Sequence, residues 1–84
     1  MAFRVIWTPK AEEELTRLWL NARDRHRIRE AADQVDRLLQ QLADAIGESR
    51  DVNQRVLFLG PLGCLVEVDT LRKYVEVKSL WRIR

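Results

Sequence analysis

The sequence predicts an α+β domain with the order β-α-α-β-β-β, in which a two-helix hairpin packs on one face of an antiparallel sheet. Residues 11–22 and 28–46 carry apolar side chains in steps of three and four, the spacing of one helix face. Residues 3–7 and 55–81 show the alternation and β-branched content of strands. Both helix stripes need an apolar surface, which only a sheet supplies. We expect the 84 residues to form a single domain, 1–84.

The first segment predicts a strand that leads directly into a helix. Residues 3–7 alternate with period two. Thr8 is a helix N-cap residue, and Pro9 suits the first helical position, where no N–H is needed. Glu12 to Glu14 then fall in the first turns, where the helix dipole favours negative charge rather than indicating a metal site. The apolar stripe consists of Ala11, Leu15, Leu18 and Ala22, beside Trp19.

A second helix is predicted after a short break at residues 21–24. Asp24 is placed to cap it, and Gly47 is a natural C-cap because glycine tolerates the left-handed conformation. Two helices joined by so short a turn form an antiparallel pair. The second stripe consists of Ile28, Ala32, Val35, Leu39, Leu42 and Ile46, widened by Ala31 and Leu38.

The last third of the chain predicts a loop and three strands. Residues 48–54 are polar and indicate the loop. The strands are 55–59, 62–69 and about 72–81, and their short connections favour an antiparallel meander. In the last strand we expect Val75, Val77, Ser79 and Trp81 on one face, and Tyr74, Glu76, Lys78 and Leu80 on the other.

Composition indicates a folded, mildly basic protein. The chain is 46% hydrophobic and 33% charged, with a formal net charge of +2. Residues 1–50 are balanced, with nine basic and nine acidic side chains, whereas residues 72–84 carry five basic residues against Glu76 alone. This distribution predicts a positive patch at the C-terminal edge that meets nucleic acid or an acidic protein.

Cysteine and motif content exclude several classes of function. Cys64 is the single cysteine, so no intrachain disulfide forms and a reducing compartment is expected. The N-terminal segment is too short for a signal peptide, and no apolar run approaches the length of a membrane span. We therefore expect a cytoplasmic protein of bacterial type. The sequence has no metal-ligand spacing and no Gly-rich phosphate loop, so no cofactor is predicted.

Five segments, in this order, carry a resemblance to a known family. They are Val5-Ile6-Trp7-Thr8-Pro9-Lys10-Ala11-Glu12-Glu13-Glu14-Leu15, the run from Ala32 to Leu39, Ile46-Gly47-Glu48-Ser49-Arg50, Gly63-Cys64-Leu65-Val66-Glu67-Val68-Asp69 and Val75-Glu76-Val77-Lys78-Ser79-Leu80-Trp81. Nearly the whole chain resembles the RelE/ParE toxins of type II toxin–antitoxin systems, the plasmid stabilisation type. In that family, RelE-type members cut messenger RNA on the ribosome and ParE-type members inhibit DNA gyrase. A partner antitoxin wraps a segment around either kind of toxin.

The resemblance implies a toxin that binds a cellular target, in the ParE manner with DNA gyrase as candidate, and that a cognate antitoxin neutralises. Two alternatives stay open: a RelE-like ribosome-dependent endoribonuclease, and a non-toxic degenerate relative that serves as a binding module. A homodimer and a toxin–antitoxin heteromer also stay open. The antitoxin is expected to add at the edge of the sheet, where strand 55–59 or strand 72–81 would expose its N–H and C=O groups.

Whether the chain is an enzyme depends on residues that depart from the RelE pattern. The family's strand arginine position falls on Cys64, its following tyrosine position falls on Glu67, and no Tyr or His follows Arg82. If the chain is a ribonuclease, Arg82, Glu67 and Arg55 are the candidate catalytic residues. The candidate partner-binding residues are Arg72, Lys73, Lys78, Trp81 and Arg84.

Simpler interpretations stand beside these roles. His26 fits an exposed helix residue, Cys64 a buried sheet residue, and Glu67 a solvent-facing strand residue. Trp7, Trp19 and Trp81 suit a core or an antitoxin interface. One cluster has two interpretations, a solvated helix start or a phosphate-binding surface, and consists of Arg23, Arg25, Arg27 and Arg29.

Overall fold

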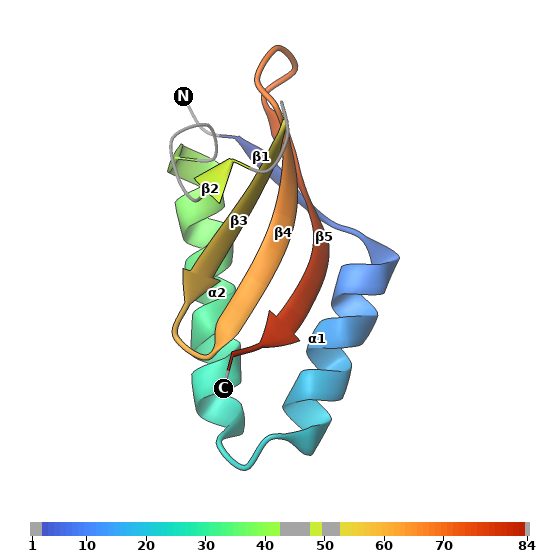
Figure 1. The fold of residues 1–84 in the computed structure, drawn as a ribbon, viewed down its shortest axis with the longest axis vertical. Coiled ribbons are helices and arrows are strands. Elements are labelled where there is room, and N and C mark those ends of the chain that lie inside the picture. Colours follow the sequence, from blue (N-terminus) through green and yellow to red (C-terminus); the bar gives the residue numbers. More distant parts are fainter. Residues whose placement is uncertain (1–2, 43–47, 50–52, 84) are drawn as a thin grey trace.

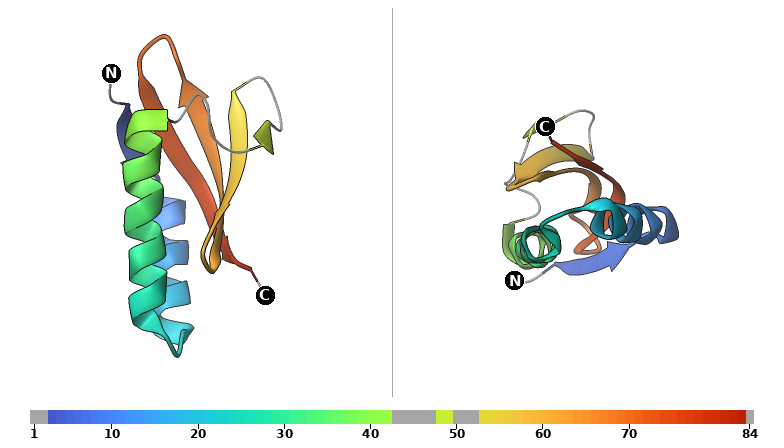
Figure 2. Two further views of the ribbon diagram at one scale, coloured as in Figure 1. Left: turned by 90° about the vertical axis from the view of Figure 1, so that its left-hand side faces the viewer. Right: turned by 90° about the horizontal axis from the view of Figure 1, so that it is seen from below.

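The computed structural model of the chain describes residues 3–42, 48–49 and 53–83. Within them, two helices lie against one face of a five-stranded sheet (Figure 1, Figure 2). The elements are β1 (Arg4–Trp7), α1 (Pro9–Asn21), α2 (Arg25–Leu42), β2 (Glu48–Ser49), β3 (Gln54–Leu59), β4 (Leu62–Asp69) and β5 (Tyr74–Arg82). The α+β class and the helical hairpin are confirmed. The short strand β2 is an addition, since residues 48–54 were expected to form a loop.

The strands lie in the order β1-β5-β4-β3-β2. β3, β4 and β5 form the predicted antiparallel meander. β1 departs from an all-antiparallel sheet, because it pairs parallel to β5, with Val5 beside Val75. No short hairpin loop joins these two strands: the helices and the meander lie between them in the sequence, which leaves the parallel direction available.

The prediction for the sheet edge is corrected by this order. β5 lies between β1 and β4, and β3 has β2 outside it, so neither of the two expected strands is outermost. β2 pairs only with Arg55 and Val56, which leaves the rest of β3 as an edge among the described strands. On its other side β5 extends beyond β1, and there the Leu80 N–H donates to Glu14 Oε1 at 3.1 Å. A side chain of α1 thus satisfies a strand group that β1 does not reach.

Each helix begins at its predicted cap. Thr8 Oγ1 accepts from the Ala11 N–H at 3.2 Å and also donates to the Val77 carbonyl at 2.9 Å, so the same hydroxyl starts α1 and fastens it to β5. Asp24 Oδ1 accepts from the Arg27 N–H at 3.2 Å at the start of α2. The predicted C-cap Gly47 lies outside the described residues, as do Ile46 and Arg84.

The core lies between the helices and the sheet, as the two stripes predict. Ile28, Val35 and Leu39 of α2 are at most 1% exposed, and Ala11 of α1 is fully buried. Leu15, Leu18 and Trp19 pack against this cluster from α1 while remaining partly exposed. The sheet contributes Leu57, Leu62, Cys64, Val66, Val68, Val75, Val77 and Leu80.

The expected faces of the last strand are wrong beyond Val77. Val75 and Val77 face the core, but Leu80 is the next buried residue, and Trp81 is exposed. A β-bulge explains the change: Val66 pairs with Val77 and Leu65 with Ser79, so Lys78 is an extra residue in β5. One inserted residue reverses the alternation for the rest of the strand.

Candidate functional site

The three candidate catalytic residues do not lie together. Arg55 is opposite Val66 in the β3–β4 register, and Val66 is fully buried on the helix side of the sheet. Glu67 is the next residue of β4, so its side chain points to the opposite, outer face. Arg82 is opposite Leu62, five residues along β4 from Glu67 and so about 17 Å away. Two cations and one carboxylate in these positions have no common point where a scissile phosphate would contact all three.

Arg55 is half-buried and donates from Nη1 to the Gln54 carbonyl at 3.2 Å. Arg55 makes a further interaction as well, so it is not a free cation. Arg55 pairs with Ser49 of β2 on one side and with Val66 of β4 on the other, so its backbone is not at the open edge of β3.

The outer face of the sheet is acidic toward the β4–β5 turn. Glu67 of β4 lies directly opposite Glu76 of β5 in the antiparallel register, and Asp69 projects from the same face of β4. Within the described residues, the ion pairs join only helix side chains, Arg17 to Glu13 and His26 to Glu30. Carboxylates directly opposite each other repel, and they also repel the phosphates of a nucleic acid.

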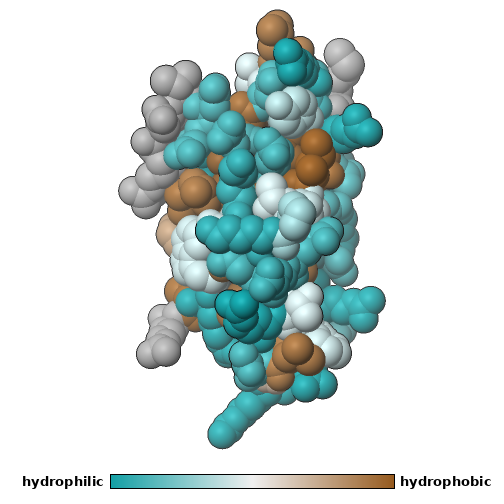
Figure 3. Space-filling view, turned by 90° about the vertical axis from the view of Figure 1, so that its right-hand side faces the viewer, coloured by the Kyte–Doolittle hydropathy of each residue, from teal (hydrophilic) through white to brown (hydrophobic). Residues whose placement is uncertain are grey.

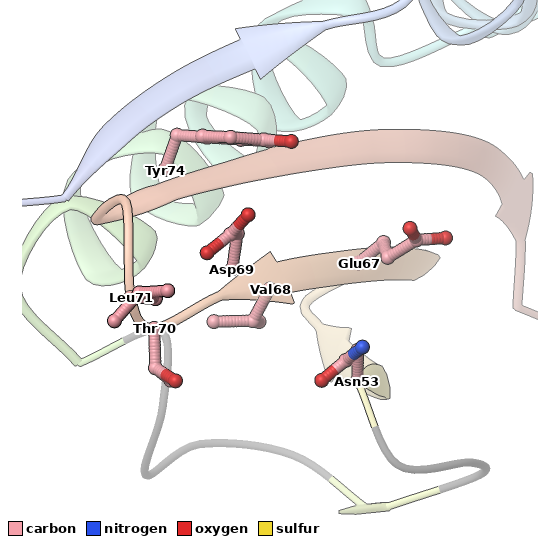
Figure 4. Close-up of a pocket in the computed structure, with 7 residues that line it drawn as sticks. All are labelled: Asn53, Glu67, Val68, Asp69, Thr70, Leu71 and Tyr74. Carbon is pink, nitrogen blue, oxygen red and sulfur yellow. The ribbon is translucent and has the colours of Figure 1, made fainter.

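A polar pocket of about 220 Å³ lies at one end of this face (Figure 4). Its lining comes from the end of β4, the β4–β5 turn and the start of β5, together with Asn53 before β3. Glu67, Asp69 and Tyr74 supply carboxylate and phenol oxygens, which suit a hydrogen-bond donor or a cationic side chain. Among the residues that the structure describes, no group of three or more potential ligands is arranged to hold a metal ion.

The opposite end of the outer face is aromatic. The rings of Phe58 and Trp81 meet edge to face with centroids 6.4 Å apart, and their exposed fractions are 53% and 37%. Gly63 lies opposite Trp81, and a Cβ there would come within 2.4 Å of the indole nitrogen. The absence of a side chain at Gly63 therefore leaves the space that the Trp81 indole occupies. Trp81 is a predicted binding residue, whereas Phe58 has no such signal in the sequence, because only the strand pairing brings the two rings together.

The predicted C-terminal positive patch is divided between two ends of the molecule. Arg72 and Lys73 lie in the β4–β5 turn, while Trp81 and Arg82 lie at the other end of β5, about 26 Å from Lys73. Lys73 has a left-handed backbone, with φ of 61°, and its ammonium lies 5.2 Å from the centroid of the Phe3 ring. Lys78 occupies the bulge between these ends. The four binding candidates within the described residues, Arg72, Lys73, Lys78 and Trp81, therefore do not make one continuous cationic surface.

A groove between the two helices was not predicted. It has a volume of about 360 Å³ and is lined by Leu15, Thr16, Trp19, Arg29, Ala32 and Asp33. Arg25 lies over the Trp19 ring at 4.5 Å from its centroid. The sequence signal was the position of Trp19 beside the apolar stripe of α1, which widens that stripe toward α2.

Cys64 and His26 have the simpler roles expected of them. Cys64 is 1% exposed, and burial raises the pKa of its thiol from 9.0 to about 12, although a hydrogen bond with the Leu57 backbone lowers it in part. A thiol with so high a pKa is not a nucleophile at neutral pH. His26 is exposed on α2 and lies 3.4 Å from Glu30. No helix of the described part of the chain is long and apolar enough to cross a membrane.

Comparison with known proteins identifies the fold. No protein-family model and no curated protein matches the chain. Two solved structures match nearly all of it. One is a chromosomal ParDE toxin–antitoxin system from P. aeruginosa, at 20% identity and a TM-score of 0.72, covering 99% of this chain and 98% of that one. The other is the RelBE2 toxin–antitoxin complex from Mycobacterium tuberculosis, at 13% identity and a TM-score of 0.73, covering 99% and 93%. The chain has the fold of the RelE/ParE toxins.

Proposed function

We propose that this chain is the toxin of a toxin–antitoxin module and that it inhibits growth by binding a protein target, with DNA gyrase as the candidate, rather than by cutting messenger RNA. The observation that carries the proposal is the chemistry of the outer sheet face. A ribonuclease needs cations gathered around the scissile phosphate, and Arg55, Glu67 and Arg82 diverge instead. The outer face instead presents a carboxylate row, which consists of Glu67, Glu76 and Asp69, and the aromatic pair of Phe58 and Trp81.

That combination suits a protein partner. Aromatic side chains are enriched at protein interfaces, because they supply large contact areas at a small entropic cost. Phe58 and Trp81 are such side chains, and they are held in place by their mutual contact and by Gly63. We expect the target to be contacted at this aromatic end, where Arg82 adds a cation at the rim.

An antitoxin partner is part of the same proposal. The two similar structures are toxin–antitoxin complexes, which supports a partner of that kind for this chain. The groove between α1 and α2 is apolar at Leu15 and Trp19 and wide enough to admit side chains of a partner segment. An amphipathic helix or an extended segment would bury those surfaces.

The first experiment is controlled expression in a bacterium, followed by a gyrase supercoiling assay with purified protein. We expect growth arrest, relief of the arrest by the protein encoded in the adjacent reading frame, and inhibition of supercoiling at micromolar concentration. Phe58→Ser should weaken inhibition at least tenfold, whereas Leu71→Ser, a change at an exposed residue in the opposite turn, should leave it unchanged.

A ribosome-dependent messenger cleavage assay separates this proposal from the ribonuclease alternative. Wild-type protein should leave the messenger intact. Cleavage that disappears in Arg82→Ala would instead establish the RelE-like activity. Normal growth on expression, with folded protein present, would point to the non-toxic binding module and contradict the toxin proposal.

A further inference from the structure

The turn between the two helices carries an arginine cluster, of which the proposed function uses only Arg29, in the lining of the groove between the helices. We define the hairpin tip as residues 20–30. It holds four arginines, Arg23, Arg25, Arg27 and Arg29, against two acidic residues, Asp24 and Glu30. The resulting formal charge of +2 equals that of the whole chain, so the remaining residues are balanced. The tip projects at the end of the molecule opposite the β4–β5 turn (Figure 1).

The charges of the tip are available to a partner. Arg23, Arg27 and Arg29 are exposed, and no carboxylate of the described residues forms an ion pair with them. The acidic side chains of the tip are engaged elsewhere: Asp24 caps α2, and Glu30 lies beside His26. Hydrophilic residues also dominate the α1 side of the molecule (Figure 3), although Leu20 of the tip is 57% exposed.

The position of the arginines is unfavourable for the helix itself. The first turn of α2 contains no acidic residue, and cations at a helix N-terminus oppose the helix dipole. Arg25 offsets this in part, because its guanidinium stacks on Trp19 and its Nη2 donates to the Leu20 carbonyl at 3.4 Å. Arg23 and Arg27 make no side-chain contact of this kind among the described residues, so folding gives no reason for their charge.

We propose that the hairpin tip is a docking site for the phosphate backbone of duplex DNA. Arginine binds phosphate oxygens through its planar fork of donors. A duplex is favoured over a single strand because single-strand binding uses aromatic rings on which bases stack. The Trp19 ring beside the tip is already covered by Arg25, and the one ring within the tip is the small imidazole of His26, which lies 3.4 Å from Glu30. Duplex DNA also presents a dense row of charge, one per about 1.7 Å.

The site is independent of the toxin proposal and of the outer sheet face. It needs no antitoxin and no gyrase, since its ligand is the DNA backbone alone. Its contacts carry no sequence information, so we expect the same affinity for duplexes of different sequence.

The test is fluorescence anisotropy of a labelled 20-base-pair duplex, titrated with the full chain between 50 and 200 mM salt. The variant Arg23→Gln/Arg27→Gln removes two cations whose side chains form no ion pair or hydrogen bond among the described residues. We expect it to bind at least tenfold more weakly at 100 mM salt and to reduce the slope of log affinity against log salt by about 1.8, or 0.9 for each lost phosphate contact. Circular dichroism and the thermal midpoint should match wild type.

The matched control is Lys10→Gln/Arg37→Gln, which removes the same charge from exposed positions on α1 and α2 outside the tip. It should bind within about twofold of wild type, since only local cations contact the backbone. Equal losses in both variants would show that net charge alone matters and would overturn the proposal. Absence of wild-type binding at 50 mM salt would overturn it as well.

Two competitors test the nature of the ligand. A single-stranded 20-mer should compete less well than the duplex, and polyglutamate at equal charge concentration should compete less well still. If the single strand binds as tightly as the duplex, or if polyglutamate displaces the duplex equally, the tip recognises a different polyanion and the assignment to duplex DNA is wrong.

Discussion

Successive side chains of β4 point to opposite faces of the sheet, and the two faces differ in burial and in charge. On the inner face, Leu62, Cys64 and Val66 are at most 1% exposed and fill the space beneath the helices. On the outer face, Leu65 is only partly buried and Glu67 lies opposite another carboxylate. The inner-face side chains are buried in the core. The outer face instead carries two opposed carboxylates, Glu67 and Glu76, and two exposed aromatic rings. The difference separates a face whose residues stability explains from a face whose charges and exposed rings stability does not explain.

The largest expected effect comes from the inner face. Leu62→Ala should lower the free energy of unfolding by about 2–5 kcal/mol, because it removes a fully buried side chain and leaves a cavity. Leu65→Ala, three residues along the same strand but only partly buried on the outer face, is the matched control and should lose less stability. Urea unfolding of both variants measures the difference. Equal losses would mean that the two faces are not distinct in energy.

Gly63 offers a sharper test of the outer face. An added methyl group would lie 2.4 Å from the Trp81 indole nitrogen and 2.6 Å from its neighbouring ring carbon, so Gly63→Ala must displace the ring. We expect a loss of about 1–3 kcal/mol in unfolding free energy, typical of overpacking. The same change in a Trp81→Ala background should be nearly neutral, since the obstructing ring is gone. A full loss in that background would place the requirement for glycine in the backbone instead.

Cys64 links the inner face to pH. Burial raises its thiol pKa from 9.0 to about 12, so between these values the unfolded chain loses the proton while the folded chain keeps it. The folded state then binds more protons, and stability, full below pH 9, falls as pH rises toward 12, by at most about 1.4 kcal/mol per pH unit. Cys64→Ala should lack this part of the decline in urea unfolding at pH 8 and pH 10. Identical pH dependence in both proteins would contradict the assignment.

Much of the fold followed from the sequence, because each element carries its own local signal. The Thr8 and Asp24 caps and the two helix stripes depend on neighbours in the chain, and the structure confirms them. The parallel pairing of β1 and the bulge at Lys78 could not be read locally, because each depends on which strand lies alongside. The bulge is what turned Leu80 inward and Trp81 outward, against the simple alternation.

The candidate site was harder to predict for the same reason. Arg55, Glu67 and Arg82 were chosen by their positions along the chain, but a residue's face depends on strand register. Register placed Arg55 and Glu67 on opposite faces and put Glu67 beside Glu76. The Phe58–Trp81 pair likewise joins residues of β3 and β5 across Gly63, a contact with no signal in either strand alone. Contacts between side chains of different strands can be identified only when the strand pairing is known.

The smallest expected effect tests the repulsive pair directly. Glu76→Lys replaces two opposed carboxylates by an opposite-charge pair across β4 and β5, and should raise the free energy of unfolding by about 0.2–1 kcal/mol. Glu76→Gln, which removes the repulsion without adding attraction, should gain less, and both gains should shrink in high salt because these charges are partly exposed. A less stable Glu76→Lys protein would mean that the Glu76 carboxylate has a favourable partner and that the outer face is not strained by its charges. A more stable protein that has also lost growth arrest would show that the carboxylate row is kept for the target at the expense of the fold.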